Sequence, residues 1–176
     1  MTSLKGGDVL IEAAASASRE LGRRVSLVMI GDGPRRQAWE RLAVRRDVPA
    51  RFTGWLAGDA LWQELRSVSV LAMPGTWPEP FGLVGLEAGA LGVPAVAFDL
   101  GGIREWLRPG ENGYLVPADP PRAAAFGAVM AEAFRDDART AAMRPASRRI
   151  ACEMSLARHV DRVERILQAN QAAVTA

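Results

Sequence analysis

The sequence is poor in side chains that bind soft metals or form disulfides. Its 176 residues include one cysteine, Cys152, and one histidine, His159. A single cysteine excludes an intrachain disulfide. The clustered cysteine and histidine ligands of a zinc site are missing as well, and no Asp-x-Asp metal motif occurs. We therefore expect no metal cofactor and a reducing, cytoplasmic setting.

Long apolar runs and a large charge imbalance are also missing. No apolar run approaches the roughly 20 residues that span a bilayer, and the first five residues lack a signal-peptide pattern. The net charge is only +2, and the arginines are scattered along the chain, which argues against nucleic-acid binding. The predicted localisation is the cytoplasm, with peripheral attachment at the inner membrane face as an alternative.

What the sequence does contain is an alternation of short apolar runs and amphipathic segments. Hydrophobic residues make up 49% of the chain, enough for a packed core. The alternation predicts a Rossmann-like, three-layer α/β/α domain with a mainly parallel sheet, ending in helices. Strands are expected at residues 25–30, 51–53, 68–73, 94–98 and 114–116. Helices are expected at residues 8–21, 34–45, 59–67, 82–91 and 101–107, and from residue 120 onward.

The domain organisation follows from this pattern. The length suits a single core. We assign residues 1–154 to one domain and residues 155–176 to its C-terminal helix, with a helix break near Ser155.

Common nucleotide and hydrolase signatures are incomplete. Gly31-Asp32-Gly33 supplies two glycines of the dinucleotide fingerprint, but Arg36 stands where the third belongs. Thr53 and Gly54 occupy the place of the acidic residue that would hold a ribose. Lys5 is not preceded by a P-loop glycine pattern, and the Gly-x-Ser-x-Gly elbow of serine hydrolases is absent.

One segment places two glutamates either side of a predicted helix start. If the helix begins near Gly82, Glu79 lies in the preceding loop and Glu87 in the second turn. The free amides around Gly82, Leu83 and Val84 and the helix dipole favour an anion such as a phosphate. Each carboxylate can accept hydrogen bonds from sugar hydroxyls. The simpler alternative is that Glu79 only favours the helix N-terminus and that Glu87 faces solvent.

Six short motifs in one order give the sequence a family resemblance. They are Lys5-Gly6-Gly7-Asp8-Val9-Leu10-Ile11-Glu12-Ala13, Ile30-Gly31-Asp32-Gly33-Pro34, Phe52-Thr53-Gly54-Trp55-Leu56, the twin-glutamate segment 79–94, Gly101-Gly102-Ile103-Arg104-Glu105, and Gly110-Glu111-Asn112-Gly113-Tyr114-Leu115-Val116. Together they resemble the C-terminal, donor-binding domain of the retaining GT-B glycosyltransferases of family 4, the glycosyl transferases group 1. The resemblance covers nearly the whole chain.

The resemblance implies the donor-binding half of a retaining enzyme that transfers a hexose from a nucleoside-diphosphate sugar to an acceptor. It implies these roles: Lys5 and Glu79 as catalytic residues; Lys5, Glu79, Phe81, Gly82, Leu83 and Val84 as contacts to the donor sugar and diphosphate; Glu87 as the ribose contact; and Trp55, Leu56 and Gly58 as the nucleobase lining. No metal or other cofactor is implied.

The sequence departs from that family in two respects. Family members are longer, with an N-terminal domain that binds the acceptor and closes over the donor. They also have a central strand before the lysine-glycine turn, with an arginine that pairs the lysine, and neither is found here. We therefore expect this chain alone to be inactive and to need a separately encoded acceptor domain as a partner.

Two alternatives to a glycosyltransferase half stay open. One is a non-catalytic sugar-nucleotide-binding or interaction module, a truncated remnant that keeps the fold. The other is a sugar-nucleotide epimerase, which shares the GT-B fold but needs catalytic residues that this chain does not show.

Overall fold

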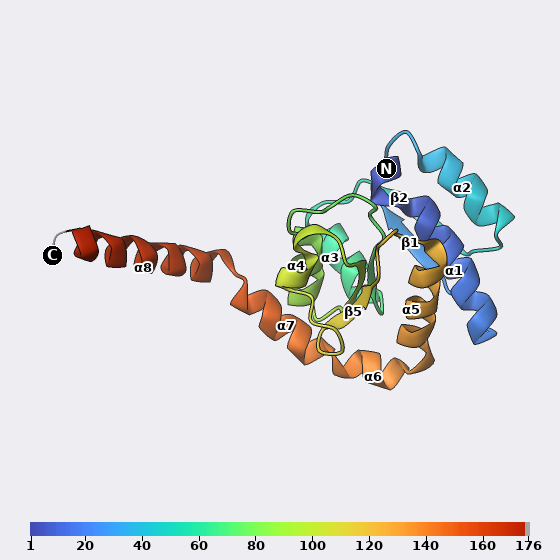
Figure 1. Ribbon diagram of the computed structural model, residues 1–176. Coiled ribbons are helices and arrows are strands. Elements are labelled where there is room, and N and C mark those ends of the chain that lie inside the picture. The colour runs from blue at the N-terminus through green and yellow to red at the C-terminus, as the bar shows by residue number, and fades with distance from the viewer. Residues whose placement is uncertain (175–176) are drawn as a thin grey trace.

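The fold consists of parallel strands enclosed by helices, as the sequence predicts (Figure 1). The structure, a computed structural model, describes residues 1–174. Its strands are β1 (Leu27–Ile30), β2 (Ala50–Gly54), β3 (Leu71–Met73), β4 (Ala95–Phe98) and β5 (Gly113–Val116). Its helices are η1 (Ser3–Lys5), α1 (Gly7–Leu21), α2 (Arg36–Arg45), α3 (Gly58–Ser67), α4 (Leu83–Ala90), η2 (Gly101–Glu105), α5 (Ala123–Arg135), α6 (Asp137–Ala142), α7 (Arg144–Glu153) and α8 (Leu156–Val174).

The strands form two parallel sheets. One sheet contains β1 and β2, and the other contains β3, β4 and β5 in that order. Every pair of neighbouring strands in the described residues is parallel. The connections between parallel strands run through helices, as they must to return the chain to the same end of a sheet.

Successive side chains of a strand point to opposite faces of the sheet. The buried residues of the central strand therefore belong to two clusters, one on each face. In β4, Val96 and Phe98 belong to the cluster that packs under α1 and α5, and the Phe98 ring meets Phe126 edge-on at 5.0 Å. Their neighbours Ala95 and Ala97 belong to the opposite cluster, with Trp106. All four residues of β4 are buried, so this strand lies in the centre of the domain.

Two strands are shorter than the sequence pattern predicts. The apolar runs at residues 25–30 and 68–73 pair with neighbours only over Leu27–Ile30 and Leu71–Met73. The unpaired residues at the amino ends of both runs line one cavity between β1 and β3. A strand needs a partner in register to form a ladder, and these residues have none in the part of the chain that the structure describes.

The helices agree with the pattern within one to three residues, with two differences. Pro34 was expected in the first turn of a helix, but α2 begins at Arg36 and Pro34 lies in the turn before it. The segment expected as a helix over 101–107 is a 3-10 helix that ends at Glu105. After a break at Ser155, α8 extends away from the rest of the molecule (Figure 1).

Close packing in the layer below α4 gives a test of this fold. A Cβ on Gly85 would lie 2.1 Å from the Trp106 ring, whereas one on Gly75 would lie 3.5 Å from the nearest atom, the Leu4 carbonyl oxygen. We expect Gly85→Ala to lower the free energy of unfolding by about 1–3 kcal/mol through overpacking. Gly75→Ala, the matched control, should change it by less than about 0.5 kcal/mol. Denaturant unfolding measures both, and equal stabilities would contradict this packing.

Candidate functional site

The predicted donor-site residues gather at the carboxyl ends of the parallel strands. Residues 74–82 follow β3, residues 99–102 follow β4, and residues 55–58 follow β2. In open parallel sheets this edge is where ligands bind. The segment over residues 1–6 crosses the same edge, because Leu4 accepts a hydrogen bond from the Thr76 amide at 3.0 Å.

Lys5 and Glu79, which are 74 positions apart in the sequence, are in direct contact. Lys5 Nζ lies 3.3 Å from Glu79 Oε2. Gly6 makes this approach possible: its φ is +65°, and a Cβ there would lie 1.9 Å from the Pro74 carbonyl oxygen. The Lys5 side chain stays 69% exposed and that of Glu79 35% exposed. The contact therefore presents an ammonium group to any anion that approaches the edge.

The loop before α4 packs closely against two glycines that follow β4, Gly101 and Gly102. Gly102 donates its amide to the Glu79 carbonyl oxygen at 2.8 Å, and a Cβ on Gly101 would lie 2.2 Å from that same oxygen. The loop is also held by Trp106, whose Nε1 donates to the Phe81 carbonyl oxygen at 2.6 Å. Sequence reasoning did not single out Trp106. No motif marks it, because its role depends on a contact across 25 positions.

The N-terminus of α4 opens toward this site. Gly82 is the N-cap, with φ +78°, and a Cβ there would lie 2.8 Å from both Met73 and Ile103 side chains. No side chain caps the helix. Leu83 and Val84 are 65% and 41% exposed, so the first turn of α4 faces solvent. The amides of this turn and the helix dipole form a local positive potential.

Glu87 lies in the second turn of α4, as predicted. It is exposed, while Ala88 and Gly89 beside it are buried. It is four positions after Leu83, so the two share one face of the helix. Glu87 therefore extends the exposed face that begins at the helix N-terminus.

The predicted nucleobase lining forms a separate, more exposed part of the same edge. Trp55 is 81% exposed, and Gly58 starts α3 with φ +55°. Leu56 is half-buried. Among the described residues, no hydrogen bond or ion pair joins this loop to Lys5 or Glu79.

The turn after β1 explains why the dinucleotide fingerprint is incomplete. Arg36, at the place of the third glycine, donates to Asp32 at 3.1 Å, to Glu40 at 2.8 Å and to the Phe52 carbonyl oxygen at 3.2 Å. The Gly33 amide and then Arg36 hold the pKa of the Asp32 carboxyl below its usual value. Arg36 thus ties the turn after β1 to β2.

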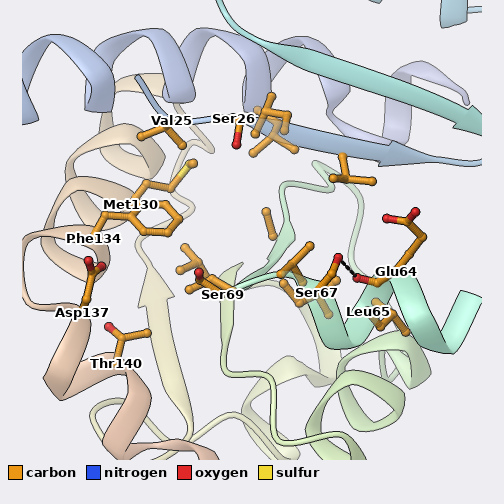
Figure 2. Close-up of a pocket in the computed structure, with 18 of the residues that line it drawn as sticks. Val25, Ser26, Glu64, Leu65, Ser67, Ser69, Met130, Phe134, Asp137 and Thr140 are labelled. Carbon is orange, nitrogen blue, oxygen red and sulfur yellow. Dashed lines mark hydrogen bonds between the residues drawn. The ribbon is translucent and has the colours of Figure 1, made fainter. Parts of the chain in front are cut away.

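Neither an enclosed pocket nor a set of metal ligands coincides with this edge in residues 1–174. The cavity of about 540 Å³ lies between β1 and β3 (Figure 2), and neither Lys5 nor Glu79 lines it. Although large pockets are the usual ligand sites, the exposed amides and charged groups lie at the open edge instead. No group of three histidine, cysteine or acidic side chains in this range could hold a metal ion. None of its helices combines the length and apolar character that crossing a membrane requires.

The comparison with protein families decides the identity of the chain. The model of the glycosyl transferases group 1 matches residues 1–150. The chain belongs to this family. A phosphatidyl-myo-inositol mannosyltransferase of Mycobacterium tuberculosis is 38% identical over 117 residues, which are 66% of this chain and 30% of the relative. A D-inositol 3-phosphate glycosyltransferase of Streptomyces avermitilis is 33% identical over 161 residues, 85% of this chain and 34% of the relative.

Solved structures confirm the fold of this family member. The Anabaena protein HepE, solved with UDP and glucose, matches with a TM-score of 0.82 and 24% identity, over 96% of this chain and 46% of that one. Sucrose-phosphate synthase of Thermosynechococcus elongatus matches with a TM-score of 0.75 and 25% identity, over 96% and 44%. The fold is the Rossmann-like fold of GT-B glycosyltransferases. The chain spans about a third of the length of its curated relatives.

The exposed position of the Lys5–Glu79 pair predicts that neither residue is needed for folding. Exposed ion pairs contribute about 0–1 kcal/mol. We expect Lys5→Met and Glu79→Gln each to leave the free energy of unfolding within about 1 kcal/mol of the unmodified chain. Thermal and urea unfolding measure this. A larger loss for either variant would assign the pair a structural role.

Proposed function

We propose that the chain is the donor-binding half of a retaining family 4 glycosyltransferase that transfers a hexose from a nucleoside-diphosphate sugar. The observation that carries the proposal is the contact between Lys5 and Glu79 beside the uncapped N-terminus of α4. It combines a cation and free amides, which suit a diphosphate, with a carboxylate, which suits sugar hydroxyls. Family membership and the UDP complexes of the structural relative support the same ligand class.

The proposal assigns to each of these residues one part of the donor. Lys5 and the amides from Phe81 to Val84 bind the diphosphate. Glu79 holds the transferred sugar, and Glu87, one helical turn further on, binds the ribose. The exposed loop of Trp55, Leu56 and Gly58 lines the nucleobase.

The chemistry follows from where charge develops. When the bond from the anomeric carbon to the diphosphate breaks, negative charge grows on the leaving group. Fixed amides and an ammonium group aimed at that charge stabilise the transition state more than the ground state. Lys5 is the only lysine of the chain, and its compact ammonium suits a point contact to phosphate. The proposal includes no metal or other cofactor.

Transfer to an acceptor is assigned to a longer assembly. Holding two reactants in attack geometry contributes about 7–11 kcal/mol in favourable cases, and water must be kept from the donor. The site described here is an open edge, since Lys5 is 69% exposed. We propose that an N-terminal acceptor domain, separately encoded or otherwise, supplies that enclosure, and that residues 1–176 alone do not transfer sugar.

The first test concerns Glu87. Charged hydrogen bonds to ribose hydroxyls contribute about 1.5–3 kcal/mol, so Glu87→Ala should weaken UDP binding about ten- to a hundredfold. Calorimetric titration with UDP measures this. Glu164→Ala on the projecting helix α8 is the matched control and should bind as the unmodified chain does. Equal affinities for all three proteins would remove Glu87 from the site.

The second test separates the sugar from the nucleotide. Because Glu79 is proposed to contact only the sugar, Glu79→Ala should leave the affinity for UDP within about twofold and lower that for UDP-glucose by about tenfold or more. Titration of one variant with both ligands provides the internal control. An equal loss for the two ligands would show that Glu79 does not bind the sugar.

A further inference from the structure

Trp106 is a buried side chain that contacts the candidate site from its inner side. It is 1% exposed and packs in the apolar cluster that contains Ala95 and Ala97 of β4. Its indole Nε1 donates to the Phe81 carbonyl oxygen at 2.6 Å. The six-membered part of the same ring lies under Gly85, where a Cβ would come within 2.1 Å of it. One ring therefore contacts the chain just before α4 and again within its first turn.

The hydrogen bond from Trp106 sets the direction of the next backbone amide. The Phe81 carbonyl group and the Gly82 N–H belong to one peptide group, which is planar and trans. In a trans peptide the carbonyl group and the N–H point in opposite directions. Because the Phe81 carbonyl group points to the buried indole, the Gly82 N–H points away from it. Among residues 1–174 this amide donates to no other group.

Gly82 lies beside the ion pair of the candidate site. A Cβ on Gly82 would lie 3.6 Å from Glu79 Cγ, and Glu79 Oε2 lies 3.3 Å from Lys5 Nζ. On the inner side, the same Cβ would lie 2.8 Å from the side chains of Met73 and Ile103. The packing leaves this residue little room to shift. The Gly82 amide is therefore a donor of fixed direction next to a cation.

Trp106 is itself held by a buried side chain. Asn112 is 4% exposed, and its Nδ2 donates to the Trp106 carbonyl oxygen at 3.0 Å. Asn112 Oδ1 accepts from the Arg108 amide at 2.7 Å. Buried polar groups that have their partners make a structure rigid. The position of the indole is thus set from the interior and does not depend on the exposed loop that it contacts.

A second buried tryptophan, Trp39, shows that this hydrogen bond is specific to the loop. Trp39 is 3% exposed and also lies under a helical glycine, Gly7 of α1, where a Cβ would be 2.5 Å from its ring. In residues 1–174 the Trp39 Nε1 nevertheless has no hydrogen-bond partner. Burial of an indole under a glycine therefore does not by itself supply an acceptor for its N–H.

We propose that the indole N–H of Trp106 positions the site for the donor diphosphate, by orienting the Phe81–Gly82 peptide so that the Gly82 amide donates to a phosphate oxygen. This role rests on the proposed donor-binding function and adds a residue that does not itself touch the donor. Hydrogen bonds in a chain polarise one another. A phosphate at the Gly82 amide should therefore strengthen the bond from Trp106 to the carbonyl group of the same peptide.

The first test is an NMR titration of the full chain with UDP. The Trp106 indole N–H signal should move downfield, and the Gly82 amide signal should move with the same apparent Kd. The Trp39 indole, whose N–H lacks a partner, serves as the internal control and should move much less. Uridine lacks the phosphates and should leave the Trp106 signal in place. A purely structural role for Trp106 predicts no shift of its N–H signal with UDP.

The second test compares two matched substitutions by calorimetric titration with UDP. Trp106→Phe keeps an aromatic ring and removes the N–H, so it should weaken UDP binding about three- to tenfold. Trp39→Phe makes the same replacement where the N–H has no partner, and its affinity should stay within about twofold of the unmodified chain. Thermal unfolding establishes that each variant is folded at the temperature of the titration.

The outcomes distinguish the role of Trp106 from the donor site itself. No UDP binding by the unmodified chain would overturn both the proposed function and this role. UDP binding with an unmoved Trp106 signal would overturn the role of Trp106 alone. Equal affinities of Trp106→Phe and the unmodified chain, or an equal loss in Trp39→Phe, would do the same. If Trp106→Phe does not fold, the NMR titration of the unmodified chain decides.

Discussion

The backbone contact between the loop at Glu79 and the two glycines after β4 is the constraint on which the site depends. The Glu79 carbonyl oxygen accepts from Gly102, and Gly101 has no room for a Cβ beside it. This contact holds the backbone of the loop that carries Glu79 just before α4. Trp106 fixes the next carbonyl group, that of Phe81, and fills the space under Gly85. The charges at the site are thus placed by packing rather than by their mutual attraction, since exposed pairs hold side chains weakly.

Arginine and lysine serve different ends in this chain. Arg36 bonds to Glu40 and Asp32, Arg104 bonds to Asp99, and Arg149 bonds to Glu153 and Glu111. Hydrogen bonds to these carboxylates raise the pKa of all three guanidinium groups. A planar guanidinium with several donors suits such multiple contacts. Lys5 instead bonds only to Glu79 among residues 1–174, in an exposed position. That pairing leaves donor capacity free at the edge where an anion is proposed to bind.

Most of the fold and the order of its elements follow from the sequence. The spacing of hydrophobic residues, and the glycines and prolines that end helices and strands, are local signals. The sequence also predicted where three candidate site residues lie in the fold: Glu79 in the loop, Glu87 in the second turn, and Gly82 at the helix start. Three features were not predicted. The position of Trp106 depends on a contact distant in sequence. Pro34 allows either a turn or a first helical turn. The lengths of β1 and β3 depend on whether a neighbouring strand is present, which no local pattern encodes.

The division of the sheet and the candidate site meet in residues 1–6. This segment is attached at one end to the turn after β1, through Met1 and Arg35, and at the other to the turn after β3, through Leu4 and Thr76. It therefore crosses from the carboxyl end of β1 to that of β3 and carries Lys5 near its far end. The separation of the two sheets sets the distance that this segment must cover, and with it the reach of Lys5 toward Glu79. The geometry of the candidate site is for this reason tied to how far apart the two sheets lie.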